Sequence, residues 1–189
     1  MPFVVPNLPF AFGSRSGTTA VGGSLNPIQS GSVSRIGATI AAYSPAGAIA
    51  TTTSWGFMAG QAPKRRTSLV VAASGTTFER GATLAYGGYG SAAAEISITV
   101  EEFVNGALTR SVTSGPTPII HIWSAVLGIQ VHQRDATAAT VLVMPIRPGR
   151  LYRWWINAVQ SALCQGVTGP SYAISNFRFD MGPVFFAFT

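Results

Sequence analysis

Residues 94–104 alternate between apolar and polar side chains, and this period of two limits most strongly what the chain can fold into. Ala, Ile and Val fill the even positions, with Glu102 as the exception. Such alternation places successive side chains on opposite faces of a β-strand. Asn105-Gly106 follows directly, and this dipeptide is the strongest short-range signal for a hairpin. The stretch therefore predicts a strand that turns back into residues 107–113.

Strand-like segments recur along the whole chain and are separated by turns that contain Gly or Pro. Gly87-Gly88-Tyr89-Gly90 is predicted to be a loop. Residues 154–164 admit a short helix as an alternative, although their alternation favours a strand. The pattern predicts an all-β fold, an antiparallel jelly-roll-like β-sandwich of eight or nine strands. The predicted strands cover residues 33–43, 48–58, 67–79, 94–104, 107–113, 118–133, 138–147, 151–164 and 171–188.

Residues 1–32 differ in composition from the rest of the chain. Pro, Phe and Val dominate as far as Phe12, and Gly, Ser and Thr follow. This composition predicts an extended N-terminal arm ahead of a single β-sandwich domain over 33–189. Apolar side chains near the start of the arm need burial, either on the parent domain or, as we expect, along a neighbouring subunit. These interface candidates are Phe3, Val4, Val5, Phe10 and Phe12.

Charged residues are scarce, at 10% of the chain, where a typical soluble domain has about a quarter. Hydrophobic residues make up 47% and the mean hydropathy is +0.34. A surface with so few charges gives a lone monomer little protection against association. The leading hypothesis is therefore a non-enzymatic structural subunit that assembles as a homo-oligomer, in a shell, filament, virion or surface layer.

The net charge of +6 raises nucleic acid as another partner. The basic residues are mostly scattered singly, and only Lys64-Arg65-Arg66 forms a cluster. This cluster follows Pro63 and lacks the interleaved aromatic residues that stack on bases. A solvated loop is the favoured interpretation, and polyanion binding stays open as the alternative.

Aromatic residues suggest a second function, a carbohydrate- or cell-surface-binding module that stacks sugar rings on exposed side chains. Trp154 and Trp155 are neighbours on one predicted strand, so only one of them can point into the core. The other would mark a binding surface or an interface between subunits. The aromatic candidates are Tyr152, Trp154 and Trp155, together with Trp55, Trp123, Tyr86 and Tyr89.

Catalysis has little support, because the chain has only six carboxylates and two histidines. His121 and His132 are an odd number of residues apart, so on a regular strand they face opposite sides. Glu101 and Glu102 are adjacent and diverge for the same reason, which excludes a glycosidase-like pair between them. No nucleophile elbow, phosphate loop or metal motif is present. We therefore expect no enzyme activity, no metal and no cofactor.

Cys164 is the only cysteine, which excludes an intramolecular disulfide, and its apolar surroundings predict a buried, inert thiol. The first six residues lack a basic region and contain two prolines, so they do not predict a secretory signal. No apolar run approaches the ~20 residues of a membrane-spanning helix, so no membrane span is expected. The compartment is left open, with a virion or an extracellular assembly as the candidates.

Overall fold

A computed structural model describes residues 13–21, 23–27, 35–43, 46–166 and 169–189. The regular structure in these ranges consists of antiparallel strands, which confirms the predicted all-β class. The strands are β1 (Gly13–Val21), β2 (Gly23–Pro27), β3 (Arg35–Tyr43), β4 (Ala46–Gln61), β5 (Ser68–Val104), β6 (Ala107–Thr113), β7 (Thr117–Pro145), β8 (Leu151–Gly166) and β9 (Tyr172–Phe188).

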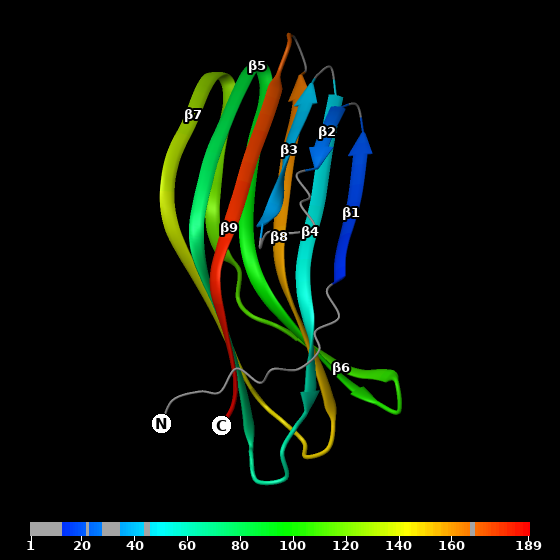
Figure 1. Ribbon diagram of the computed structural model, residues 1–189. Helices are drawn as coiled ribbons and strands as arrows, with labels where there is room; N and C mark the ends of the chain where they lie inside the picture. Colours follow the sequence, from blue (N-terminus) through cyan, green and yellow to red (C-terminus); the bar gives the residue numbers. More distant parts are fainter. Residues whose placement is uncertain (1–12, 22, 28–34, 44–45, 167–168) are drawn as a thin grey trace.

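A long two-stranded ribbon, made of β5 and β7, folds back on itself and creates the sandwich (Figure 1). Before a bend at residues 86–89, β5 pairs with β9, and after it β5 pairs with β8. β7 follows the same bend and stays paired with β5 on both sides. In addition β3 pairs with β9 and β4 pairs with β8, so the chain is wrapped as a jelly roll.

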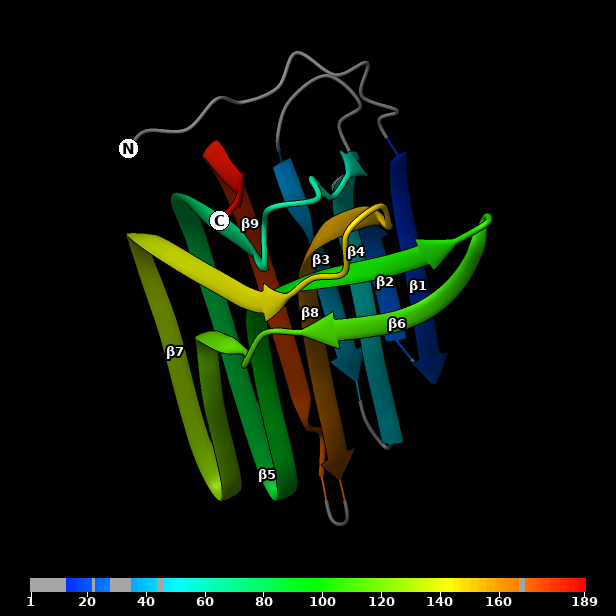
Figure 2. The ribbon, with the colours of Figure 1, turned by 90° about the horizontal axis from the view of Figure 1, so that it is seen from below.

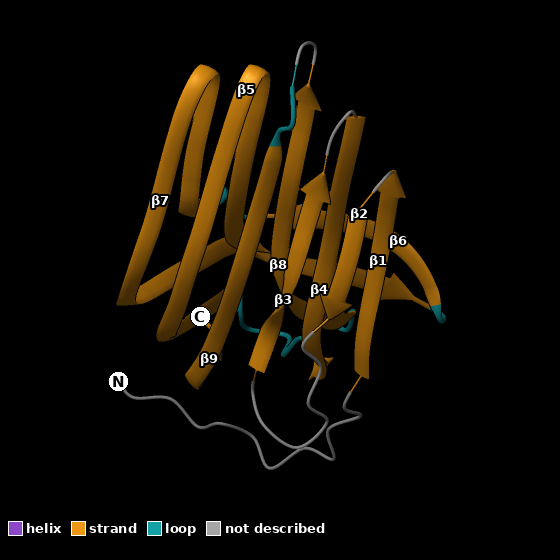
Figure 3. Cartoon of the chain, turned by 90° about the horizontal axis from the view of Figure 1, so that it is seen from above, coloured by secondary structure: helices purple, strands orange, loops and turns teal. Residues whose placement is uncertain are grey.

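The strands lie in two layers that share β5 and β7. One layer runs in the order β2, β3, β9, the first limb of β5 and the second limb of β7. The other layer runs β1, β4, β8, the second limb of β5 and the first limb of β7. Figures 2 and 3 show β7 at one side of the molecule and β1 at the other. β7 therefore lies at the outer edge of both layers.

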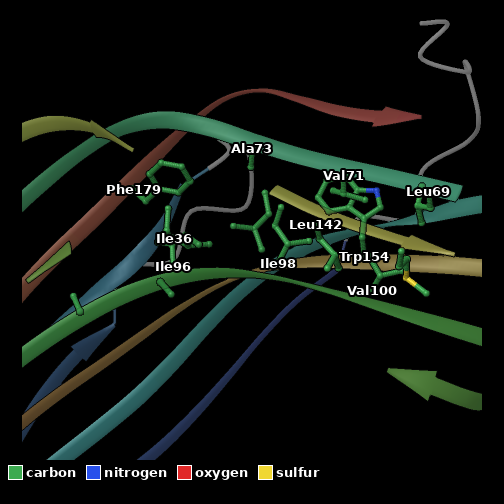
Figure 4. Close-up of a cluster of buried hydrophobic side chains, with 14 of the residues drawn as sticks. Ile36, Leu69, Val71, Ala73, Ile96, Ile98, Val100, Leu142, Trp154 and Phe179 are labelled. Carbon is green, nitrogen blue, oxygen red and sulfur yellow. The ribbon is translucent and has the colours of Figure 1, made fainter. Parts of the chain in front are cut away.

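The main core fills the space between the layers and confirms the alternation of residues 94–104. Ile96, Ile98 and Val100 are fully buried there, and Trp154 and Phe179 pack in the same cluster (Figure 4). The residue that breaks the apolar pattern, Glu102, is also fully buried on this inner face. Residues 154–164 continue a strand, so the helical alternative is wrong.

The sequence predicts two breaks between strands that the structure does not have. One is a bend within a strand, and the other is continuous strand. The glycines at 87–90 bend β5 within one strand, with Gly87 at φ 65°. β7 runs unbroken through 134–137, where a break was expected, and it bends at Val126, which has a φ of 63°. Position 126 itself carries no turn residue. β7 bends there because it pairs with β5 on both sides and follows the glycine bend of β5.

Part of the predicted arm belongs to the domain itself. β1 pairs with β4 and β2 pairs with β3, so the outer strands of both layers begin before residue 33. Among the described residues, paired strands therefore begin at Gly13. The apolar candidates Phe3, Val5, Phe10 and Phe12, with Val4, lie outside the described residues.

The Asn105-Gly106 turn has the geometry that its sequence predicts, with φ 50° and 82°. Positive φ at both central residues is the requirement of a type I′ turn. Gly106→Val is expected to lower the free energy of unfolding by about 1–2 kcal/mol, because a β-branched residue is strained in the left-handed region. Urea denaturation measures this. The control is Gly115→Val, since a Cβ at either glycine meets nothing within 4 Å. Equal stability of the two variants would contradict the turn assignment.

Candidate functional site

Four of the five tyrosines lie at the end of the sandwich where β5 bends. Tyr43 ends β3 and is directly opposite Tyr172, the first residue of β9. Tyr172 is in turn opposite Leu84 on β5. Residues opposite each other in antiparallel strands share a face, with Cβ atoms about 5 Å apart. Tyr86 and Tyr89 flank the bend itself.

Two of these tyrosines, Tyr43 and Tyr172, line a shallow hollow of about 280 Å³, close to the lower end of the size range of small-ligand sites. Tyr43 and Tyr86 are about half exposed, at 52% and 53%. The lining residues are Tyr43, Leu84, Pro170, Ser171 and Tyr172.

The segment before β9 closes one side of the hollow and positions Tyr86. The backbone N–H of Tyr86 donates a hydrogen bond to Ser171 Oγ at 3.4 Å. The Tyr86 ring lies against Gly169, where any Cβ would overlap the ring. A glycine at 169 is therefore required for this ring position.

The lining of the hollow carries no formal charge. Tyrosine combines a broad apolar ring with a hydroxyl that both donates and accepts hydrogen bonds. Among the residues that the structure describes, no cluster of three His, Cys, Asp or Glu side chains could hold a metal ion. The hollow is thus suited to a neutral ligand that has both apolar faces and hydroxyl groups.

The aromatic strand singled out from the sequence does not contribute to this surface. Tyr152, Trp154 and Trp155 are buried, with exposures of 0%, 4% and 7%. Trp154 lies in the core and Trp155 on the opposite face, as predicted for neighbours on a strand. Trp123 is exposed on the first limb of β7. Trp55 lies on β4, and its side chain is not among those that the structure describes.

The adjacent carboxylates are held in two separate buried networks. Glu101 Oε2 accepts hydrogen bonds from Arg153 Nε at 2.7 Å and from Trp155 Nε1 at 3.0 Å. On the inner face the Tyr152 hydroxyl donates to Glu102 Oε2 at 3.0 Å. Burial raises the pKa of Tyr152, so the phenol stays protonated as this donor. The predicted divergence of the two carboxylates is confirmed, and both have structural partners.

The histidines are also separated. His121 is exposed, whereas His132 is on the inner side of the second limb of β7, with Nε2 at 2.9 Å from Glu79 Oε2. Glu79 is 3% exposed and also accepts a hydrogen bond from Thr77. Sequence reasoning missed this partly buried pair, because only the β5–β7 register brings residues 79 and 132 together.

The remaining candidates lie away from the hollow. Lys64, Arg65 and Arg66 are exposed in the connection between β4 and β5, in agreement with the predicted loop. Cys164 is buried, as predicted, in a small second core. No helix in the described ranges has the length and apolar character needed to cross a membrane.

Comparison with known proteins gives no family for this chain. No protein-family model matches it, and no curated protein is similar to it. One solved structure is similar in part, the carbohydrate-binding module TmCBM61 in complex with β-1,4-galactotriose. The sequence identity is 11%, with 94% of this chain and 88% of that chain covered, and the TM-score is 0.20. At that TM-score the two structures superpose poorly as wholes, so the likeness has no bearing on function.

Proposed function

We propose that this chain is a non-enzymatic binding module that holds a neutral carbohydrate in the tyrosine-lined hollow. The observation that carries the proposal is the pairing of Tyr43 and Tyr172 at an uncharged, solvent-exposed hollow. Sugar rings have apolar C–H faces that pack on aromatic rings, and hydroxyl groups that pair with phenols.

The chemistry of the hollow favours a neutral sugar over an anionic ligand. Sites for phosphate or carboxylate groups depend on arginine, lysine or clustered backbone N–H groups. The side chains that line the hollow include neither basic residue, although the whole chain carries a net charge of +6. The overall charge is therefore not concentrated at the candidate site.

A self-assembling structural subunit stays a second candidate function. The scarcity of charge favours it, and so does one exposed strand of the sandwich, which is described in the next subsection. Binding and assembly are compatible, because the residues that line the hollow belong to β3, β5, β9 and the segment before β9, whereas a partner strand would add on the far side of β7.

Removing the two rings at the hollow is expected to abolish most of the binding. Tyr43→Ala and Tyr172→Ala should each weaken affinity about tenfold, since an aromatic contact contributes about 0.5–1.5 kcal/mol. Affinity gel electrophoresis against soluble galactan, xylan, β-glucan and mannan measures retention. Tyr43→Phe separates the ring from its hydroxyl and should keep most of the affinity.

Trp123→Ala is the matched control, because Trp123 is an equally exposed aromatic residue, at 56%, outside the hollow. It should leave retention unchanged. The proposal is wrong if none of the four polysaccharides retards the wild-type chain, or if the double variant Tyr43→Ala/Tyr172→Ala migrates as the wild type does.

A further inference from the structure

The second limb of β7, residues 127–145, forms an open sheet edge. Among the described residues β7 pairs with β5 alone, so the backbone groups on its far side have no strand partner. Natural proteins protect such edges with lysine, proline or bulges. This limb has neither lysine nor proline before its last residue, and its two charged side chains are Arg134 and Asp135. Asp135 already forms an ion pair within its own chain, with Arg80 Nη1 at 2.8 Å from Asp135 Oδ1.

The open edge carries two blocks of exposed aliphatic side chains on one face. Leu127, Ile129 and Val131 are exposed by 71%, 71% and 70%. Val141 and Val143 are exposed by 58% and 62%. Exposed apolar patches of this kind mark interaction sites. An edge that combines unpaired backbone with aliphatic side chains is suited to a strand of another chain.

The two blocks are symmetric about Ala136, which identifies the partner. In an antiparallel pair of two copies centred at Ala136, Val131 faces Val141 and Ile129 faces Val143. Leu127 then faces Pro145, which is also exposed. The charged centre meets neutral residues, since Asp135 faces Thr137 and Arg134 faces Ala138. A two-fold dimer needs this self-complementarity, and an unrelated partner does not.

A second hollow lies one strand inward from the edge, over Ala72 of β5 and between Val141 and Phe185. It has a volume of about 180 Å³ and lies beside Val141, which faces Val131 of the other copy in the register above. Ala72 and Phe185 form much of its wall, and Phe185 is 56% exposed. Exposed apolar surface therefore continues from Val141 inward to Phe185.

We infer that two copies of this chain pair antiparallel through residues 127–145, with the two-fold axis at Ala136. The layer that contains this limb of β7 then continues into the same layer of the other copy as one sheet. The inference goes beyond the proposed carbohydrate binding and does not rest on it. The two are tested by different measurements, molecular mass for the dimer and carbohydrate retention for the hollow. The tyrosine variants leave the edge of β7 intact, whereas Ile129 is directly opposite Leu84, which lines the hollow.

Sedimentation equilibrium of the full chain tests the dimer, with twice the 19.7 kDa monomer mass as the expected result. Ile129→Lys/Val143→Lys places like charges opposite each other twice and should raise the dissociation constant at least a hundredfold. Ile129→Lys/Val143→Glu changes the same positions but pairs opposite charges, and it should remain largely dimeric. Leu108→Lys, an exposed change on β6, is the second control.

Cysteine cross-linking tests the register. Val131→Cys mixed with Val141→Cys should form a disulfide between the two variants under mild oxidation. Neither variant should cross-link with itself, because the two copies of residue 131 lie ten positions apart, about 33 Å along the strands. A monomer at micromolar concentration, a dimer that survives Ile129→Lys/Val143→Lys, or a dimer without the mixed cross-link would each overturn the inference.

Discussion

Arg153→Ala is expected to lower the free energy of unfolding by about 3–5 kcal/mol, because it leaves a buried carboxylate without its countercharge. Arg153 Nη2 lies 2.6 Å from Glu101 Oε2, and the Glu101 side chain is 7% exposed. The same guanidinium stacks on Phe103, with its Cζ 4.8 Å from the ring centre. Urea denaturation near neutral pH measures the loss.

Two comparisons separate the buried ion pair from general effects of removing an arginine. Arg147→Ala should cost less than about 1 kcal/mol, because Arg147 is 68% exposed and lies 3.8 Å from Glu102. Adding Glu101→Gln to Arg153→Ala should recover part of the lost stability, since no charge is then buried alone. Equal stability of the Arg153→Ala and Arg147→Ala variants would refute a strong Glu101–Arg153 pair.

The sequence predicts the class of fold well where a local signal and the tertiary environment agree. The alternation of residues 94–104 corresponds to a strand with one face in the core, and Asn105-Gly106 forms the expected turn. The jelly-roll wrapping is less visible, because β5 and β7 cross between layers by bending rather than by ending. A bend inside a strand leaves only its glycines as a local signal, and β7 has none at Val126 itself.

The candidate site could be predicted only in part. Tyr86 and Tyr89 lie beside a glycine-rich bend and are recognisable as aromatic residues near a turn. Tyr43 and Tyr172 are separated by most of the chain, and only the β3–β9 register makes them neighbours. The densest aromatic segment, around Trp154, is misleading because large aromatic residues also fill cores, and here they do.

The bend of β5 connects the stability of the fold to the candidate site. Gly88 is directly opposite Gly166 on β8, and it lies between Tyr86 and Tyr89 in the bend of β5. A Cβ on Gly88 would overlap the backbone carbonyl oxygen of Gln165 and lie 2.9 Å from the Cα of Gly166. Because the obstructing atoms are backbone, no side-chain rotation can relieve the overlap.

Gly88→Ala is therefore expected to lower the free energy of unfolding by about 3 kcal/mol and to weaken carbohydrate retention, as β8 and the bend move apart. Thermal unfolding and affinity electrophoresis measure the two effects. Gly115→Ala is the control, because a Cβ there meets nothing within 4 Å, and it should change stability by less than about 0.5 kcal/mol. If Gly88→Ala matched Gly115→Ala in stability, the close approach of β5 and β8 would be wrong. Lost stability with full retention would show that carbohydrate binding does not depend on the bend of β5.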